Sequence, residues 1–271
     1  MPELPEVETI KNELSPYVIG RSITGVTLLW ERMLRQPLSG EFQARIKGRR
    51  IIGVARRGKY LIFRLDNGYS LIIHLKMSGS LLLGGYVTPK YTRAIIKLND
   101  GNSIFFRDPR KFGKIQLVKS ENSVTNKLGH EPLECDFTSE VLAKKLEKRK
   151  APVKAVLLDQ SLIAGIGNMY ADESLFAARI NPLKPAGSLS QAEINRLYEA
   201  IQIVLRNAIN SKGASVSTYL RPGGEIGTAH SHFKVAHKKD KPCPVCGTSI
   251  ERIPIRQRGS YYCPGCQPEK G

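Results

Sequence analysis

The chain has 271 residues, of which 41% are hydrophobic and 24% charged, a composition typical of a globular protein with enough length for one large domain or two of ordinary size. No apolar run approaches the length of a membrane span and the N-terminus is acidic, unlike a signal peptide, so we expect a cytoplasmic protein. Lysine and arginine number 42 against 24 acidic residues, and the net charge of +18 favours nucleic acid as a partner over a ribosome surface or an anionic lipid.

The first six residues read MPELPE, and they suggest an unusual nucleophile. Removal of Met1, the usual fate before a small second residue, exposes the secondary amine of Pro2. The pKa of an α-amino group is about 8 and that of a lysine about 10.4. At neutral pH a far larger fraction of the terminal amine than of a lysine is therefore unprotonated. Its attack on the anomeric carbon of a sugar, with ring opening, leaves a permanently cationic iminium that favours elimination. Glu3 and Glu6 would supply the proton transfers.

The same residues also fit the start of an ordinary helix. Pro5 is tolerated in a first helical turn, where Glu3 and Glu6 complement the positive end of the helix dipole. Apolar residues at positions 7, 10 and 14 continue with helical spacing and predict that the helix is real. Taken alone, the segment leaves both interpretations open.

Residues 22–119 predict a series of short strands. Turns rich in Asn, Asp and Gly at 66–68 and 99–101 are typical of tight hairpins. The paired strands are predicted at 61–65 with 69–75 and at 94–98 with 103–107. We therefore predict an α+β protein whose first half is a two-layer antiparallel β-sandwich with the N-terminal helix packed against it. Ten basic residues and one acid between Arg32 and Arg64 favour a groove that follows phosphates over a merely solvated face.

The second half predicts helices, after a polar interdomain linker at about 120–136. Helical patterns cover 139–149 and begin again at 152–159. A Ser-x-x-Glu capping box at Ser190 opens a longer helix that stops at Gly213.

Two further segments of this half have features of a functional site. The sequence Gly-Ile-Gly-Asn at 165–168 lies at a helix start, where backbone N–H groups and the Asn168 amide would form a phosphate-binding corner. The alternative is that Asn168 only caps the helix. Residues 213–240 are rich in Gly, Ser, Thr and His and are predicted to form a long, mobile, functional loop.

Four of the five cysteines form two Cys-x-x-Cys pairs with sixteen residues between them, a spacing typical of a structural site for one zinc ion. The expected ligands are Cys243, Cys246, Cys263 and Cys266. A disulfide framework is disfavoured in a cytoplasmic protein, and Cys135 is expected to be a partly buried small residue. A hairpin between the pairs would carry residues 256–259, and an arginine held there suits a DNA phosphate.

Six motifs occur in one order along the chain, and together they identify a family. They are PELPEVE at 2–8, RGKYL at 57–61, HLKMSG at 74–79, DPRKFG at 108–113, DQ at 159–160 continuing to GIGNMY at 165–170, and the terminal cysteine element. The chain closely resembles the bacterial formamidopyrimidine-DNA glycosylases over nearly its whole length. The resemblance implies a helix-two-turns-helix repair enzyme that removes oxidised purines, such as 8-oxoguanine and formamidopyrimidines, and then cuts the strand by β and δ elimination.

The resemblance also implies roles for individual residues. Pro2 would be the Schiff-base nucleophile, Glu3 the proton donor at the sugar, and Glu6 a residue that helps to hold the site. Lys59 would act in β elimination and Arg258 in δ elimination, and both would bind phosphate.

The resemblance further implies DNA contacts. The implied DNA-binding residues are His74, Met77, Tyr91, Arg110, Phe112, Lys154 and Asn168. Lys154 and Asn168 map to phosphate contacts. A glycosylase must flip its target nucleotide out of the stack, and Met77, Arg110 and Phe112 match the residues that fill the vacated space. Ordinary packing within the sandwich is the alternative for these three.

The chain departs from the family pattern at two places. Family members often carry a His pair where this chain has Tyr91 and Arg93. The loop at 214–231, which in the family closes over the flipped base, has Arg-Pro-Gly-Gly-Glu at 221–225 and does not match well.

The predicted organisation has three parts: a catalytic β-sandwich at 1–130, a helical domain with the base-capping loop at 131–240, and a zinc finger at 241–271. We expect a monomer that acts on double-stranded DNA with oxidised bases or abasic sites and needs no protein partner or membrane. Two rival interpretations stay open: an endonuclease VIII-like enzyme for oxidised pyrimidines, and a zinc-ribbon protein that binds nucleic acid without catalysis.

Overall fold

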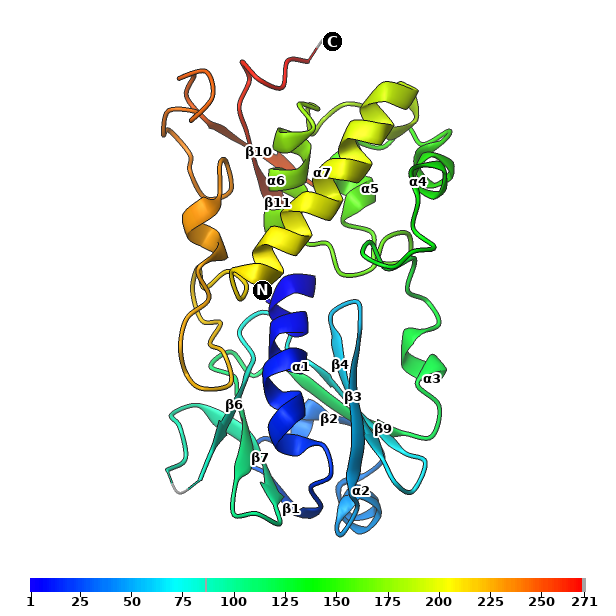
Figure 1. Ribbon diagram of the computed structural model, residues 1–271, viewed down its shortest axis with the longest axis vertical. Helices are drawn as coiled ribbons and strands as arrows, with labels where there is room; N and C mark the ends of the chain where they lie inside the picture. Colours follow the sequence, from blue (N-terminus) through cyan, green and yellow to red (C-terminus); the bar gives the residue numbers. More distant parts are fainter. Residues whose placement is uncertain (86, 270–271) are drawn as a thin grey trace. The chain divides into compact units, whose positions relative to one another are not determined.

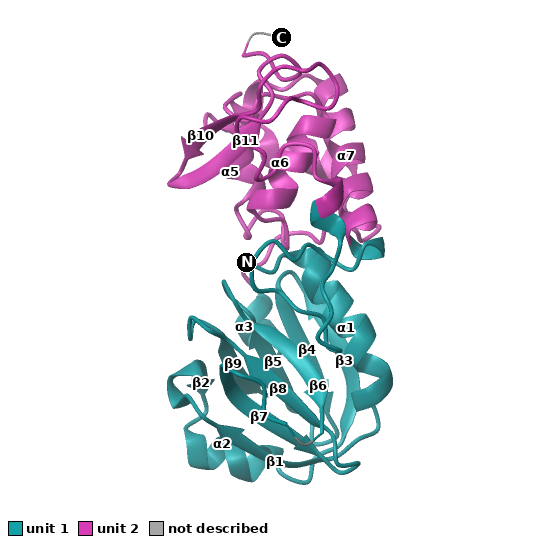
Figure 2. Cartoon of the chain, turned by 90° about the vertical axis from the view of Figure 1, so that its left-hand side faces the viewer, with its two compact units in different colours: residues 1–126, 209–230 teal, residues 127–208, 231–271 magenta. Residues whose placement is uncertain are grey.

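The computed structural model describes residues 1–85 and 87–269, which form two compact units. The first unit comprises residues 1–126 and 209–230, and the second comprises residues 127–208 and 231–271 (Figure 2). The chain therefore leaves the first unit after residue 126 and returns to it for one later segment.

Two sheets form the first unit. The four-stranded sheet runs in the order β1 (Ile23–Leu28), β7 (Thr92–Leu98), β8 (Ser103–Arg107) and β6 (Ser80–Gly84). The five-stranded sheet runs in the order β2 (Leu34–Gln36), β9 (Lys114–Val118), β5 (Ser70–His74), β4 (Tyr60–Leu65) and β3 (Ile51–Arg57). All pairs are antiparallel except β2 with β9. Both predicted hairpins are present, as β4–β5 and β7–β8.

The N-terminal helix α1 (Leu4–Val18) packs onto the core that the two sheets share (Figure 1). Its residues Val7, Ile10 and Leu14 are fully buried, as their spacing predicted. They lie in one apolar cluster with Phe63 of β4 and Phe106 of β8. Burial of each such side chain stabilises the folded state by roughly 1.5–3 kcal/mol. The cluster therefore holds the helix in place against the strands. The predicted sandwich with a covering helix is confirmed.

Short elements complete the first unit. They are η1 (Glu31–Met33), α2 (Ser39–Ile46) and α3 (Asn122–Thr125).

The Glu8 carboxylate of α1 pairs with the Arg56 guanidinium of β3, with 2.7 Å between Oε2 and Nε. Helix α1 is therefore held on the first unit by both apolar and charged contacts.

The second unit is helical with one hairpin. Its elements are α4 (Ser139–Leu146), α5 (Val153–Leu157), α6 (Asn168–Ala177), η2 (Ala186–Ser188), most of α7 (Gln191–Asn210), β10 (Glu251–Ile255) and β11 (Arg258–Tyr262), and η3 (Ala229–His232) lies across the unit boundary. Helix α4 ends three residues earlier than predicted, just before Lys148 takes a left-handed φ of 57°.

The capping box before α7 is confirmed. The Ser190 backbone N–H donates to Glu193 Oε2 at 2.8 Å, and the Glu193 N–H donates to Ser190 Oγ at 3.3 Å. These two bonds satisfy backbone groups that a helix start otherwise leaves unpaired. Across residues 1–85 and 87–269, no helix has both the length and the hydropathy that crossing a membrane requires.

Candidate active site and nucleic-acid interface

The N-terminal residues are held by hydrogen bonds at the start of α1. Pro2, Glu3 and Glu6 are all buried. Glu6 Oε2 accepts a 2.7 Å hydrogen bond from the Glu3 backbone N–H, and Glu3 and Glu6 form a capping box. Glu6 Oε1 accepts a second hydrogen bond, at 2.8 Å, from the N–H of Ala214. One carboxylate therefore joins the chain terminus to a segment 208 residues away.

The segment that meets Glu6 is the start of the predicted mobile loop. Gly213 has a φ of +76°, and a Cβ on it would lie 2.9 Å from Glu6 Cγ, so only glycine fits there without strain. Tyr219 enters the apolar core of the first unit, and its hydroxyl donates to the Lys212 carbonyl at 3.3 Å. Burial and the charge of Glu6 raise the pKa of Tyr219, so its phenol stays protonated.

An ion pair fastens the same loop to α1. Arg221 Nε lies 3.0 and 3.1 Å from the two carboxylate oxygens of Glu13, and Arg221 Nη2 lies 2.6 Å from Oε1. The backbone N–H of Leu83 in β6 donates to the Pro222 carbonyl at 2.8 Å. The segment is therefore held on two elements of the first unit.

We expect Arg221→Met to loosen this loop. A partly exposed ion pair contributes about 1 kcal/mol or less, so local opening should become up to about fivefold more frequent. Hydrogen exchange of the backbone amides of residues 215–227 measures this directly. Lys11→Met is the matched control, because Lys11 pairs with Glu8 on the same helix. Equal exchange in both variants would show that the ion pair does not hold the loop.

His74, at the end of β5, is neutral in the folded protein. Burial, helped by the charges of Lys76 and Lys59, lowers its pKa to about 3. Its Nδ1 accepts a 2.9 Å hydrogen bond from the Lys76 N–H, which places the ring hydrogen on Nε2. Lys59 lies in the turn between β3 and β4 and is itself buried. Near neutral pH the imidazole can therefore offer an N–H donor but no charge.

The predicted void-filling residues are on two turns that share one buried carboxylate. Asp108 accepts hydrogen bonds from the Ser78 hydroxyl, from the Arg110 N–H at 3.3 Å and from the Gly113 N–H at 2.7 Å. Met77 and Phe112, on these turns, are 42% and 46% exposed. Both side chains are therefore partly open to solvent, where they are accessible to a partner.

Asp108 is a residue whose role the sequence analysis did not identify. The one sequence signal is its position before a proline in the DPRKFG motif, where Asp often organises a turn. The Arg110 guanidinium lies 4.8 Å from the centre of the Phe112 ring. Cation and ring are therefore adjacent on one turn that Asp108 holds in shape.

Tyr91 lies beside the same turn and is surrounded by cations. Its carbonyl accepts a 3.0 Å hydrogen bond from the Asp108 N–H, and it has a left-handed φ of 68°. Lys90, Arg93 and Arg107 place their charges 5.1, 6.0 and 5.6 Å from its ring centre. An exposed ring with three cations around it is a surface that attracts phosphate.

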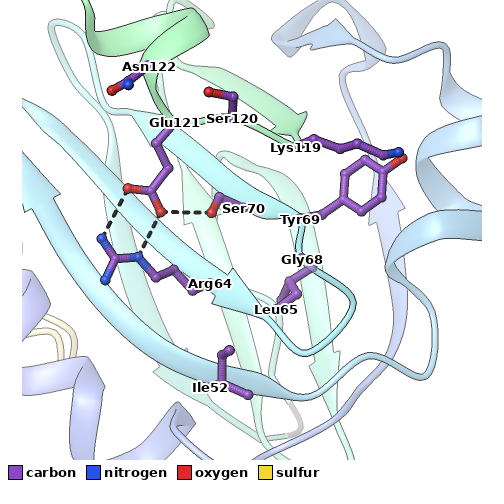
Figure 3. Close-up of a pocket in the computed structure, with 10 residues that line it drawn as sticks. All are labelled: Ile52, Arg64, Leu65, Gly68, Tyr69, Ser70, Lys119, Ser120, Glu121 and Asn122. Carbon is purple, nitrogen blue, oxygen red and sulfur yellow. Dashed lines mark hydrogen bonds and ion pairs between the residues drawn. The ribbon is translucent and has the colours of Figure 1, made fainter.

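A pocket of the first unit lies beside α3 and has a different character (Figure 3). There Glu121 pairs with Arg64, with 2.8 Å between Oε1 and Nε, and accepts a 2.9 Å hydrogen bond from the Ser70 hydroxyl. None of the predicted site residues is among the residues that line it in the described part of the chain. These three polar side chains bond one another, so their contacts join β4 and β5 to the segment that leads into α3.

In the second unit, two predicted DNA-binding residues form hydrogen bonds with the hairpin. The Asn168 Nδ2 group donates to the Gly259 carbonyl at 2.8 Å. Lys154 is completely buried, and its Nζ lies 2.7 Å from Ser260 Oγ and 2.6 Å from Asp172 Oδ1. Asn168 is the first residue of α6, and Gly167 is the N-cap residue, so Asn168 does not cap the helix.

Arg258 lies at the tip of the hairpin, as predicted. It opens β11 and is exposed, and the turn before it, Arg256 and Gln257, has φ angles of 43° and 62°. Two successive left-handed residues are typical of the tight turns that suit a twisted hairpin. The turn therefore presents this guanidinium to solvent.

The four predicted cysteine ligands come together behind this hairpin. Their sulfur atoms lie within 4.8 Å of one another. The Cys246–Cys263 and Cys243–Cys266 sulfur pairs are 3.4 and 3.8 Å apart. A zinc ion with bonds of about 2.3 Å needs tetrahedral edges of about 3.8 Å, so the set fits one zinc. Within the described ranges, no other group of three or more His, Cys, Asp or Glu side chains could hold a metal.

Models of three known domains match successive parts of the chain. Residues 1–115 match the formamidopyrimidine-DNA glycosylase N-terminal domain, and residues 128–220 match the formamidopyrimidine-DNA glycosylase H2TH domain. Residues 240–268 match the zinc finger found in FPG and IleRS. The three matches follow the order of the motifs, and the last covers all four cysteines.

Relatives with the same description are similar over the full length. The chain is 46% identical to the formamidopyrimidine-DNA glycosylase of Chloroflexus aurantiacus, with 98% of each chain covered. It is 42% identical to that of Geobacillus kaustophilus, with 98% of this chain and 100% of the relative covered.

Solved structures are similar as well. The MutM (Fpg) protein of Thermus thermophilus superposes with a TM-score of 0.91 at 38% identity, with 100% of both chains covered. Lactococcus lactis Fpg, solved in complex with DNA that contains an abasic site, superposes with a TM-score of 0.92 at 33% identity, with 98% of this chain and 100% of that chain covered.

Proposed function

Since this chain belongs to the formamidopyrimidine-DNA glycosylase family, we propose that it excises oxidised purines from double-stranded DNA and then cleaves the strand through the N-terminal amine of Pro2. The chain is a DNA glycosylase of base excision repair, and its four cysteines form a zinc-finger site. The assignment of individual residues to the chemical steps is our proposal.

In the proposed first step, the Pro2 nitrogen bonds to the anomeric carbon and the bond from that carbon to the damaged base breaks. Glu3 protonates the sugar ring oxygen, the ring opens, and the nitrogen becomes part of a cationic iminium. The Pro2 nitrogen loses its N–H proton in this step, and the base gains that proton and leaves as a neutral molecule. The observation that carries this step is the buried Pro2–Glu3–Glu6 arrangement, in which Glu6 fixes the backbone of Glu3.

Strand cleavage then uses the iminium as an electron sink. Loss of a proton from the adjacent sugar carbon expels the 3′ phosphate, and a second elimination expels the 5′ phosphate. We propose that Lys59 assists the first of these steps and Arg258 the second. The buried position of Lys59 near neutral His74 and the exposed position of Arg258 on the hairpin support these roles.

We propose that two exposed turns, 76–79 and 108–113, bind the DNA and help to flip the damaged nucleotide. We call them the wedge turns. Met77, Arg110 and Phe112 are on the two turns that Asp108 organises, so their exposed side chains are preorganised to enter a duplex. Tyr91 with its three surrounding cations would follow the adjacent phosphates. We further propose that the protein works as a monomer in the bacterial cytoplasm, on the nucleoid, to which its charge of +18 would attract it.

Borohydride trapping tests the chemistry and the substrate class together. Untagged protein, with loss of Met1 verified by mass, is incubated with duplexes that carry 8-oxoguanine opposite cytosine, an oxidised pyrimidine, or an abasic site. We expect the strongest covalent adduct on the 8-oxoguanine duplex among the two base lesions, because the wedge and N-terminal motifs are those of the purine enzyme.

The other outcomes are equally informative. An adduct on the pyrimidine and abasic duplexes alone would keep the imine mechanism and move the substrate to that of an endonuclease VIII-like enzyme. No adduct on any duplex would contradict the role of Pro2.

A further inference from the structure

We propose that the buried ion pair between Lys154 and Asp172 is a positioning device that holds the zinc-finger hairpin in the shape that presents Arg258 for the second elimination. This inference rests on the role proposed above for Arg258. It makes Asp172 and Ser260 contributors to strand cleavage, although neither contacts DNA in the proposal.

The two charges hold the hairpin at successive residues. Lys154 on α5 and Asp172 on α6 have fully buried side chains, with 2.6 Å between Nζ and Oδ1. The Lys154 ammonium also donates to Ser260 Oγ at 2.7 Å. The second oxygen of Asp172 accepts a 3.1 Å hydrogen bond from the backbone N–H of Tyr261. Lys154 also donates to the Gly259 carbonyl at 3.4 Å, so each member of the pair bonds its partner and at least one residue of β11.

Asn168 adds a third attachment from the same face of α6. It precedes Asp172 by four residues, about one helical turn, and donates to the Gly259 carbonyl. Three consecutive residues of β11, 259 to 261, are thus fixed to α5 and α6 by polar side chains. Arg258 immediately precedes these three residues. Their attachment to α5 and α6 therefore also fixes the position of the Arg258 backbone.

The energetics favour a role in geometry over one in stability. The free energy lost when two charges leave water offsets much of the free energy gained from their attraction. Apolar residues of similar volume are therefore often equally stabilising. Burial raises the pKa of Asp172 to about 7 even though the Lys154 charge opposes the shift, which reflects that cost. The pair offers instead a directional set of hydrogen bonds that apolar packing lacks.

The same geometry gives Lys154 a role in DNA processing without a direct phosphate contact. A lysine that binds phosphate must present its ammonium to the ligand, and here that group is enclosed with Asp172 and Ser260. We therefore assign Lys154 to positioning, in place of the phosphate contact that the family resemblance implies.

The test measures how cleavage of an abasic-site duplex divides between the β product and the β,δ product. Zinc-loaded, full-length variants are compared in single turnover at saturating enzyme: Asp172→Asn, Lys154→Met, and the double variant Lys154→Met with Asp172→Leu. We expect the δ:β product ratio to fall about 10-fold or more in each, because a displacement of about 1 Å can cost that much. The Pro2 adduct with borohydride should stay within about twofold of wild type.

Two controls separate positioning from loss of fold. The double variant leaves no unpaired charge, so it should fold and bind one zinc while still losing the hydrogen bonds to Ser260 and Tyr261. Lys184→Met removes another ion pair of the second unit, with Glu193, and should leave the ratio unchanged. An unchanged ratio in the folded, zinc-loaded double variant would overturn the inference.

Arg258→Ala distinguishes the inference from the function on which it rests. If Arg258→Ala leaves the ratio unchanged, the proposed role of Arg258 is wrong and the inference falls with it. If Arg258→Ala lowers the ratio but the Asp172 and Lys154 variants do not, only the inference fails. The salt dependence of DNA affinity, measured in the Arg258→Ala background, tests Lys154 separately because the contact of Arg258 with phosphate is already absent there. A slope that Lys154→Met leaves unchanged in this background supports positioning, and a slope reduced by about one means a direct phosphate contact.

Discussion

Pro2→Gly and Glu3→Gln should each lower excision of 8-oxoguanine by about 100-fold or more while DNA affinity stays near that of wild type. Glycine keeps an N-terminal amine but forms an imine that must gain a proton to act as an electron sink, and it leaves the buried site of the proline ring unfilled. Glutamine keeps the shape of Glu3 at the start of α1 but has no acidic proton to give to the sugar. Single-turnover excision and fluorescence anisotropy with the same duplex measure the two quantities.

Glu8→Gln is the matched control for these variants. Glu8 lies on the same helix, one turn beyond the terminus, and its carboxylate is bound to Arg56 and Lys11. A loss confined to Pro2→Gly and Glu3→Gln would exclude a general effect of altering α1. Undiminished excision by both variants would defeat the proposed mechanism, whatever their affinity for DNA.

Removal of zinc, or Cys243→Ser, should weaken DNA binding by about 10-fold or more and leave the β-sandwich folded. The thiolates and the hairpin form one small cluster, in which the buried Cys243 and Cys263 pack with Phe176 and Ile250. Without metal, such small elements often unfold, and Arg258 would then lose its fixed presentation. Affinity at a fixed salt concentration measures the first effect, and hydrogen exchange in the strands of the first unit measures the second.

Cys135→Ser provides the control for this experiment. Cys135 is exposed, so the prediction that it is partly buried was wrong, and it lies outside the group of four sulfur atoms. Its replacement should therefore change neither zinc content nor affinity. Unchanged affinity in zinc-free protein would count against any role of the hairpin in DNA binding. Loss of exchange protection throughout the first unit would instead show that the zinc finger supports the whole fold.

Local patterns account for the parts of this protein that could be predicted in advance. The spacing of Val7, Ile10 and Leu14 requires only that one face of a helix be apolar, and the hairpin turns require only Asn, Asp and Gly between alternating residues. Likewise the two Cys-x-x-Cys pairs bring four thiolates around one ion with little regard to the rest of the chain. Such features depend on residues close in sequence, so the sequence expresses them directly.

The resemblance added residue roles, but not the contacts that would carry them out. It marked Lys154 as a phosphate contact, whereas the structure buries its ammonium against Asp172 and Ser260. It assigned no role to Asp108, which holds both wedge turns in shape. A charged residue in a motif is equally compatible with a surface contact and a buried pair until its neighbours are known.

The sequence by itself therefore determined the helix at the terminus, the antiparallel hairpins, the zinc ligands and, through its ordered motifs, the enzyme family. Only the tertiary structure decided which distant groups meet: Glu6 with Ala214, and Arg221 with Glu13, each 208 residues apart. The physical reason is that helical and hairpin patterns repeat over a few residues, whereas these pairs form only when separate elements pack around a common core. The hydrogen bonds and the burial at these contacts between distant elements produce no repeating pattern in the sequence.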